Sequence, residues 1–284
     1  MKVLAANIED VFREAAARWT LVTYFLLSTM FVLIFAAAVN LDVVDGALAG
    51  AKLFGKDVHV NDSVSIENVV TVFESGFAST LYYLSTLLAV FATAHLVPRM
   101  QEKGTIDLYL SRPVARAKLL FSRYAAGLLL AASNIVYLLG AMWLIILWKT
   151  HVAHPRFLLA GAIILLVTAA LLAFSFLVGV VTSSTAVSIM MTYGIYLFSA
   201  LLVPYRKYAA AVSYEWEAFL IKALYWVIPK AASLGVAAGA FVSGSGKLPT
   251  ELQRMLTIGP FLSTALFAAG CLALAAWLFQ RKEF

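Results

Sequence analysis

Two histidines, His151 and His154, have a spacing that could hold a metal ion. No cysteine or carboxylate lies close by in the sequence to complete a ligand set, so solvated loop histidines are the simpler interpretation. A third histidine, His95, lies one helical turn before Arg99. We expect His95 to form a hydrogen bond between helices rather than to take part in catalysis.

A glycine-rich segment, Gly244-Ser245-Gly246-Lys247-Leu248, is similar to part of a phosphate-binding loop. The full motif requires a glycine five residues before its second glycine and Ser or Thr after the lysine, but this chain has Phe241 and Leu248 there. We therefore expect no nucleotide site and no catalytic residue in this chain. The single Cys271 lies in an apolar run and is predicted to be a packing residue.

The composition indicates which elements must position these residues. The chain of 284 residues is 63% hydrophobic and 13% charged, whereas soluble domains are about a quarter charged. Its charges are clustered, and the uncharged windows between them are long enough for helices that cross a bilayer. These windows lack the alternation of barrel strands. We predict an all-α, polytopic membrane protein whose net charge of +6 reflects basic residues beside the spans, not binding of nucleic acid.

Gaps between charged residues define the predicted spans. We expect a single transmembrane domain over residues 1–284, with six spans at about 19–41, 75–98, 124–148, 157–181, 185–205 and 255–280. An amphipathic helix over 3–17 would lie on the membrane surface before the first span. An even number of spans puts both termini on one side, and the density of Lys and Arg in the short segments there predicts the cytoplasm.

Two segments on the opposite side are longer than simple turns. Residues 42–74 contain Asp57-Val58-His59-Val60-Asn61, which alternates like a short strand and predicts a small exterior elaboration. Residues 206–254 contain apolar runs that are too short to span, so we expect an exterior, re-entrant or interfacial segment there.

The predicted spans contain no Asp, Glu, Lys or Arg. Since charges within a membrane mark ion pathways and proton relays, their absence argues against a channel with a charged filter, a proton-coupled carrier and an acid–base enzyme. Asn134 is most simply a polar contact between helices. If the protein moves a substrate, the energy must therefore come from a partner.

A charged island over residues 99–123 separates the second and third spans. It holds six Lys or Arg residues and two acidic residues, and short basic loops of this kind stay in the cytoplasm. Residues 104–111 can form about two turns of helix, with Ile106, Tyr109 and Leu110 on one face. This helix could lie in the groove of a partner or pack on its own bundle, and the spacing leaves both interpretations open.

The island resembles a known signature. The E-x-G-T-[LI]-x-x-L-L-S-x-P-[VI]-x-R pattern of type 2 ABC exporter permeases is similar to Glu102-Lys103-Gly104-Thr105-Ile106-Asp107-Leu108-Tyr109-Leu110-Ser111-Arg112-Pro113-Val114-Ala115-Arg116. Tyr109 departs mildly from this pattern, because the family usually has leucine there. The closest subgroup includes the permease of nitrous-oxide reductase copper-site maturation, and the likeness in topology covers the whole chain.

The resemblance implies the transmembrane subunit of an ABC transporter in the cytoplasmic membrane of a bacterium or archaeon. It would pair with a second permease copy, identical or different, within the membrane lipid. Two separate ATPase subunits would bind ATP and Mg, and no cofactor would bind this chain. The residues implied in coupling and partner binding are Glu102, Gly104, Thr105, Ile106, Asp107, Leu108, Tyr109, Leu110, Ser111, Arg112, Pro113 and Arg116.

The resemblance also implies a role for each part of this coupling helix. Gly104 would allow a tight turn into the helix, and Arg112 and Arg116 would contact acidic residues or lipid. The apolar residues that would fill the ATPase groove are Ile106, Leu108, Tyr109 and Leu110.

Two other classes of function remain open from the sequence. The chain could be a membrane subunit that transmits ATP-driven motion to an exterior partner without moving a substrate, which a packed interface without a cavity would favour. It could also be an integral membrane enzyme, which would require polar residues converging from several spans.

Overall fold

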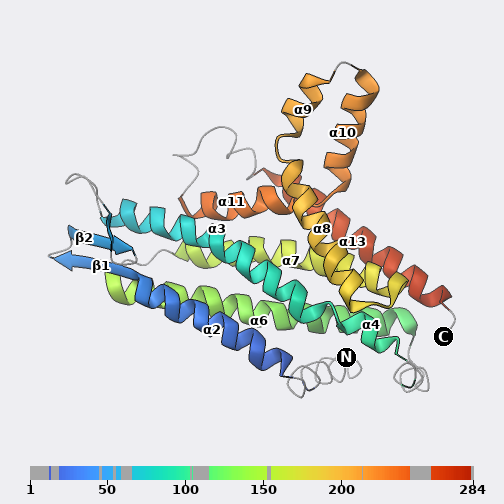
Figure 1. The fold of residues 1–284 in the computed structure, drawn as a ribbon, viewed down its shortest axis with the longest axis horizontal. Coiled ribbons are helices and arrows are strands. Elements are labelled where there is room, and N and C mark those ends of the chain that lie inside the picture. The colour runs from blue at the N-terminus through green and yellow to red at the C-terminus, as the bar shows by residue number, and fades with distance from the viewer. Residues whose placement is uncertain are drawn as a thin grey trace.

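Long helices that run side by side form most of this all-α structure (Figure 1). A computed structural model describes residues 13, 19–44, 47–53, 56–58, 66–102, 104, 115–151, 155–212, 214–243 and 257–282. The helices are α2 (Thr20–Ala38), α3 (Ile66–Thr93), α4 (Leu96–Met100), α6 (Arg116–Thr150), α7 (Pro155–Thr182), α8 (Thr185–Leu201), α9 (Tyr205–Ala211), α10 (Glu215–Val227), α11 (Ala231–Ser243) and α13 (Ile258–Arg281). The strands are β1 (Val39–Val44), β2 (Ala47–Leu53) and β3 (Lys56–Val58).

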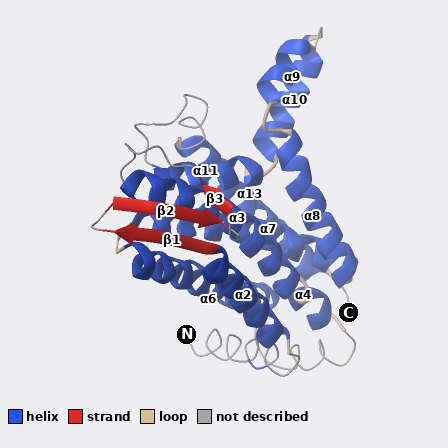
Figure 2. Ribbon diagram, turned by 60° about the vertical axis from the view of Figure 1, so that its left-hand side comes forward, coloured by secondary structure: helices blue, strands red, loops and turns tan. Residues whose placement is uncertain are grey.

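The bundle has two ends, which we name by what lies there (Figures 1 and 2). The sheet end carries the three strands. The loop end carries the starts of α2 and α6, the ends of α4, α7 and α13, and the turn between α7 and α8. The helices on either side of the charged island therefore meet the end of the last helix.

Several helices are long enough to cross a membrane. Among the described residues, four stretches are long and apolar enough to cross a membrane. Two bent pairs of helices, α8 with α9 and α10 with α11, raise the number to six if each pair counts as one span. The four are Glu74–Met100, Arg116–Thr150, Pro155–Thr182 and Ile258–Arg281. These helices confirm the prediction of an all-α, polytopic membrane protein.

The first predicted span, 19–41, extends beyond the helix that the structure places there. Helix α2 ends at Ala38, and β1 begins at Val39. The sequence from Val39 to Val44 is rich in β-branched residues, and β1 pairs with β2 in antiparallel register, Val39 opposite Leu53. The predicted surface helix over 3–17 lies outside the described residues except for Arg13.

The small sheet joins α2 to α3 and has the order β1-β2-β3, with both pairs antiparallel (Figure 2). Its first ladder shifts register between Asp42 and Val43. The strand predicted at 57–61 overlaps β3 at Asp57 and Val58, and residues 59–61 lie outside the described part of the chain. The structure thus adds a compact β element to the segment expected to form an exterior elaboration.

Helix α7 is the centre of the bundle. It packs against α3, α6, α8, α11 and α13, and its sequence is apolar all round, as expected for a helix enclosed by others. One buried cluster surrounds Phe157 near its first turn, and another surrounds Phe176 near its last turns. Both ends of the bundle are therefore built on the same helix.

Polar side chains hold α2 and α6 together. Asn134 donates from Nδ2 to Ser28 Oγ at 2.9 Å, and both residues are buried. Thr29 and Tyr137 share a hydrogen bond of 2.8 Å between their hydroxyls. The predicted role of Asn134 as a polar contact between helices is confirmed.

After α2, α3, α6 and α7, the chain runs along the bundle a fifth time as α8 and α11 (Figure 1). This fifth passage is discontinuous. Helix α8 leaves the loop end and stops at Leu201, and α11 continues toward the sheet end from Ala231 (Figure 1). The two pieces adjoin, because the amide of Ala232 donates to Ser199 Oγ at 3.1 Å. Tyr82 of α3 donates its hydroxyl proton to the carbonyl of Ala231 and fixes α11 from the other side.

Between these two pieces, α9 and α10 form a helical hairpin that projects sideways from the bundle (Figure 1). Helix α9 is bent by 63° from α8, and α10 by 61° from α11. The hairpin corresponds to the first part of the segment 206–254, and α11 to a later part.

We predict that Gly239 is required for the contact between α11 and α3. A Cβ at this position would lie 2.6 Å from the carbonyl oxygen of Ser75, which is backbone and cannot rotate away. Gly239→Ala should therefore lower the free energy of unfolding by about 1–3 kcal/mol, seen as a lower unfolding temperature in detergent.

Gly270→Ala on α13 is the matched control, because an added Cβ there meets no heavy atom within 4 Å. It should leave the unfolding temperature unchanged or raise it slightly, since alanine has the higher helix propensity. Equal unfolding temperatures for the two variants would contradict the close approach at Gly239.

Candidate coupling site

The predicted coupling residues lie in a loop whose two ends are described by the structure. Glu102 and Gly104 belong to the segment that leads into the loop, and Arg116 begins α6 after it. The other predicted residues lie outside the described part of the chain: Thr105, Ile106, Asp107, Leu108, Tyr109, Leu110, Ser111, Arg112 and Pro113. Their docking role stays a prediction.

The chain turns sharply as it leaves α4. The amides of Gln101 and Glu102 donate to the carbonyls of Pro98 and Arg99, at 3.1 Å in each case, which closes two tight turns. Gly104 has a φ of 86°, in the left-handed region that glycine adopts without a steric penalty. The role of Gly104 at the entry to the coupling helix stays a prediction, because residues 105–114 lie outside the described part of the chain.

The segment before the loop is fixed to the turn between α7 and α8 through Gln101. Its Nε2 donates to the carbonyl of Gly179 at 2.9 Å. Its Oε1 accepts from Ser183 Oγ at 3.0 Å and from Lys282 Nζ at 2.6 Å. We call Gln101, Ser183 and Lys282 the Gln101 cluster.

Lys282 is the centre of this cluster. Its ammonium also donates to Ser183 Oγ at 2.7 Å and to the carbonyl of Val180 at 2.8 Å. Val180 lies in the last turn of α7, where unpaired carbonyls favour a cation. Partial burial lowers the pKa of the Lys282 ammonium below its usual value. The cluster thus joins α4, α7 and α13 through one side chain.

The segment after the loop is fixed to the same place. Arg116 Nη1 donates to the carbonyl of Lys282 at 2.7 Å and approaches that of Gln280 at 3.4 Å. The arginine that the resemblance assigned to acidic residues or lipid therefore contacts the backbone at the end of α13. Through Lys282, both ends of the loop attach to one point.

Arg123 is buried, although its sequence position suggested a loop residue beside the membrane. Its side chain is 2% exposed, and Nη1 donates to the carbonyl of Leu96 at the first turn of α4 at 3.3 Å. Arg123 therefore braces α6 against α4 behind the loop. Arg123 follows Arg116 by seven residues, which is two helical turns. This spacing could have predicted that both arginines lie on one face of α6.

The structure describes only some of the other polar candidates. His151 caps α6 with a φ of 55° and an amide donating to Leu147 O at 2.8 Å, and it is exposed. His154 and the Gly244 to Lys247 segment lie outside the described residues. Within the described ranges, no three His, Cys, Asp or Glu side chains are grouped so that they could hold a metal ion. His95 is buried at the start of α4.

At the loop end, α4 is packed into the buried core of the bundle. Leu96, Val97 and Met100 of α4 are buried in the cluster around Phe176 and Phe279. A displacement of the loop would therefore act at once on α4, α6 and α13, and on α7 through the Gln101 cluster.

Comparison with known proteins places this arrangement in a family. A family model described as an ABC-2 family transporter protein matches residues 10–284, which includes the loop and both of its attachments. The match is to the family as a whole and does not single out the copper-maturation subgroup. No curated protein matches the sequence.

We predict that Lys282→Met loosens the segment before the loop. The substitution removes the ammonium that joins Gln101, Ser183 and Val180. Loss of about 1.5 kcal/mol of local stability, the lower end of the range for a hydrogen bond to a charged group, should raise amide hydrogen exchange near Gln101 at least tenfold.

Lys118→Met is the control, because this lysine is exposed on α6 and lies outside the cluster. It removes the same charge and should leave the exchange rates near Gln101 unchanged. Identical protection in both variants would show that the cluster does not hold this segment.

Proposed function

This chain belongs to the ABC-2 family of transporter proteins and is the membrane permease subunit of an ABC transporter, and on that basis we propose that a separate ATPase subunit drives it through the loop over 99–123. The chain is an integral, multi-pass membrane protein. Membership in the family implies an ABC ATPase partner, which would supply the nucleotide site that the sequence lacks.

One observation carries this proposal, namely the attachment of both ends of the loop to the end of α13. Gln101 contacts the Lys282 ammonium, and Arg116 contacts the Lys282 carbonyl. Because the loop is attached at two points, a force applied to it would be transmitted to α4, α6 and α13. This arrangement supports the loop as the place where an ATPase acts.

The sign of the charge at the loop end supports a cytoplasmic location for it and for both termini. Arg99, Arg116, Lys118 and Arg281 accompany Lys282 there, and basic residues beside spans stay on the cytoplasmic side. An ATPase that uses cytoplasmic ATP and Mg would reach the loop from this side. Two ATPase copies would serve a pair of permeases, of identical or different chains.

The proposed direction of transport is export. Closure of the ATPase pair on ATP would move the two loops, and each permease would tilt as a rigid body between inward and outward states. The packed contacts of α7 with its neighbours favour such rigid-body motion over local bending.

A second candidate function uses the same motion without a substrate. The sheet at the far end of the bundle is a structured element on which an exterior protein could dock. In that case, ATP-driven tilting would be transmitted to the exterior partner.

We predict that Leu110→Asp disconnects the ATPase from this chain without preventing membrane insertion. A carboxylate in an apolar groove is strongly unfavourable, so the amount of ATPase recovered with the chain in mild detergent should fall at least tenfold. Leu108→Asp should act in the same way.

Leu110→Met is the control, since it keeps an apolar side chain of similar volume and should retain the ATPase. The partners should be identified by mass spectrometry of the complex from native membranes. A soluble subunit with a complete phosphate-binding loop is expected, and an exterior protein recovered with it would favour the second candidate. Full ATPase recovery with both aspartate variants would refute docking at this loop.

A further inference from the structure

Helix α8 meets the rest of the bundle through hydroxyl groups. Its buried residues are Ser188, Thr192, Tyr196 and Ser199. They follow one another at intervals of four, four and three residues, so they share one face of the helix over about 16 Å. The large exposed side chains of α8, among them Met190, Leu197 and Phe198, are apolar. This helix therefore buries its polar face, the reverse of a helix on the surface of a soluble protein.

Helix α7 lies beside α8 and runs in the opposite direction (Figure 1). A Cβ added to Gly179 of α7 would lie 3.4 Å from the hydroxyl of Ser188, which fixes the register of the two helices. Ser175 lies one helical turn before Gly179, and Thr168 lies two further turns before Ser175. The face of α7 that meets α8 therefore also carries hydroxyls.

The antiparallel register places the hydroxyls of the two helices at matching levels. One turn away from the contact at Gly179, Ser175 lies at the level of Thr192. Two turns further on, Thr168 lies at the level of Ser199. The hydroxyls thus continue along the interface from the start of α8 almost to its end.

A third helix adds a hydroxyl to this interface. The ring of Tyr83 on α3 contacts the ring of Tyr196, with 6.3 Å between their centres. Thr86 follows Tyr83 by one helical turn and is fully buried. We name the whole set the hydroxyl seam, which consists of Thr86 of α3, Thr168 and Ser175 of α7, and Ser188, Thr192, Tyr196 and Ser199 of α8.

Four hydroxyls of the seam have no hydrogen-bond partner among the described residues, namely those of Thr86, Thr168, Ser175 and Tyr196. Within a helix, a serine or threonine hydroxyl can donate to the carbonyl four residues earlier, as Thr192 does to Ser188 at 2.6 Å. The three unpaired serine and threonine hydroxyls do not form this bond. A buried hydroxyl without a partner is costly, and buried water makes hydrogen bonds to such groups. The seam therefore has the chemistry of a site for water.

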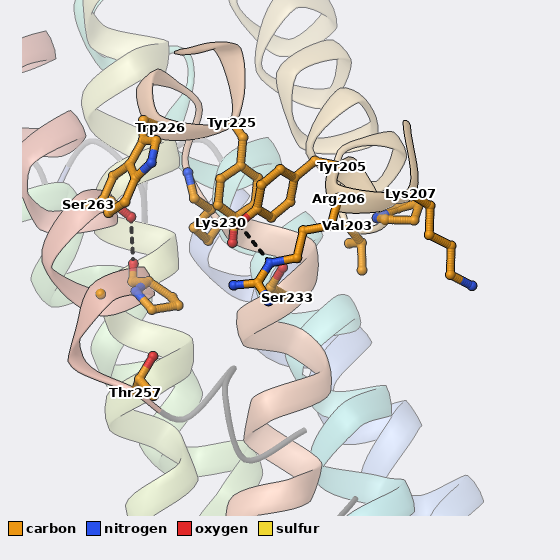
Figure 3. A pocket seen from close by; sticks show the side chains of 13 residues that line it. Val203, Tyr205, Arg206, Lys207, Tyr225, Trp226, Lys230, Ser233, Thr257 and Ser263 are labelled. Carbon is orange, nitrogen blue, oxygen red and sulfur yellow. Dashed lines mark hydrogen bonds between the residues drawn. The ribbon is translucent and has the colours of Figure 1, made fainter. Parts of the chain in front are cut away.

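The seam runs between two polar regions of the molecule. Near the loop end, Ser188 follows Ser184, the residue that caps α8, by one helical turn. At the far end, Ser199 Oγ accepts from the amide of Ala232 at 3.1 Å. The next residue, Ser233, lines a cavity of about 580 Å³ at the break in the fifth passage (Figure 3). The seam thus connects the loop end with this cavity.

We infer that water fills the hydroxyl seam and forms a path through the bundle from the loop end to the cavity. This water supplies partners to the four unpaired hydroxyls. No residue of the seam carries a charge, so the path is suited to water rather than to ions. The inference does not rest on the docking of an ATPase, because no residue of the seam belongs to the loop over 99–123.

The test measures the reactivity of single cysteines along the seam. The full chain carries Cys271→Ala with Ser188→Cys, Ser175→Cys or Thr168→Cys, and is placed in phosphatidylcholine nanodiscs without an ATPase. Methyl methanethiosulfonate is added, and the cysteine thiolate attacks its sulfenyl sulfur, forms a mixed disulfide and releases methanesulfinate. Because a buried thiolate forms only where a polar group such as water stabilises its charge, the rate of this reaction reports hydration.

Ala173→Cys in the same Cys271→Ala background is the matched control. Ala173 is buried on α7 two residues before Ser175, which places it on the side of the helix away from α8. Each rate is divided by the rate of the same variant unfolded in sodium dodecyl sulfate. The three seam cysteines should react at least tenfold faster than Ala173→Cys. If Thr168→Cys does not yield folded protein, Thr86→Cys takes its place, because Thr86 belongs to the same seam.

Two results would overturn the inference. Equal relative rates in Ser175→Cys and Ala173→Cys would show that the seam is dry. Fast reaction confined to Ser188→Cys would show that water stops near the loop end and does not form a path.

Discussion

A helix that breaks inside a packed bundle must find partners for the backbone groups that the break releases, because a buried amide or carbonyl without one is costly. Here hydroxyl groups of neighbouring helices supply them. Ser199 accepts from the amide of Ala232, and Thr264 of α13 accepts from the amide of Lys230. Tyr82 of α3 donates to the carbonyl between these two amides. Because these contacts are in place, the fifth passage can leave the bundle as a hairpin and resume as α11.

The break and the loop end belong to one packed body. Helix α7 contacts both pieces of the fifth passage, and its last turn accepts the ammonium of Lys282. Helix α13 provides Thr264 at the break and ends in the residue that holds the loop. Helices α7 and α13 therefore connect the loop end to the break in the fifth passage through direct contacts.

The sequence predicts the features that depend on local pattern. Charge gaps identify the apolar helices, and a buried amide such as Asn134 predicts a contact between them. The attachments of the loop could not be predicted, because they join residues far apart in the chain: Gln101 and Lys282 are separated by 181 positions. From the sequence alone, Lys282 and Arg123 also cannot be distinguished from ordinary basic residues beside a membrane. Only the fold brings them to backbone carbonyls that need a donor.

The position of Lys282 has a consequence for biogenesis. A ribosome makes a chain from its N-terminal side to its C-terminal side, so the loop is synthesised before α13. Until α13 has been synthesised and inserted, Gln101 and Arg116 have no partner at its end. The two ends of the loop thus gain their attachments to Lys282 only when the last described helix is in place. A chain without α13 would keep the contacts of Gln101 with Gly179 and Ser183 but would lose the attachments of both loop ends to Lys282.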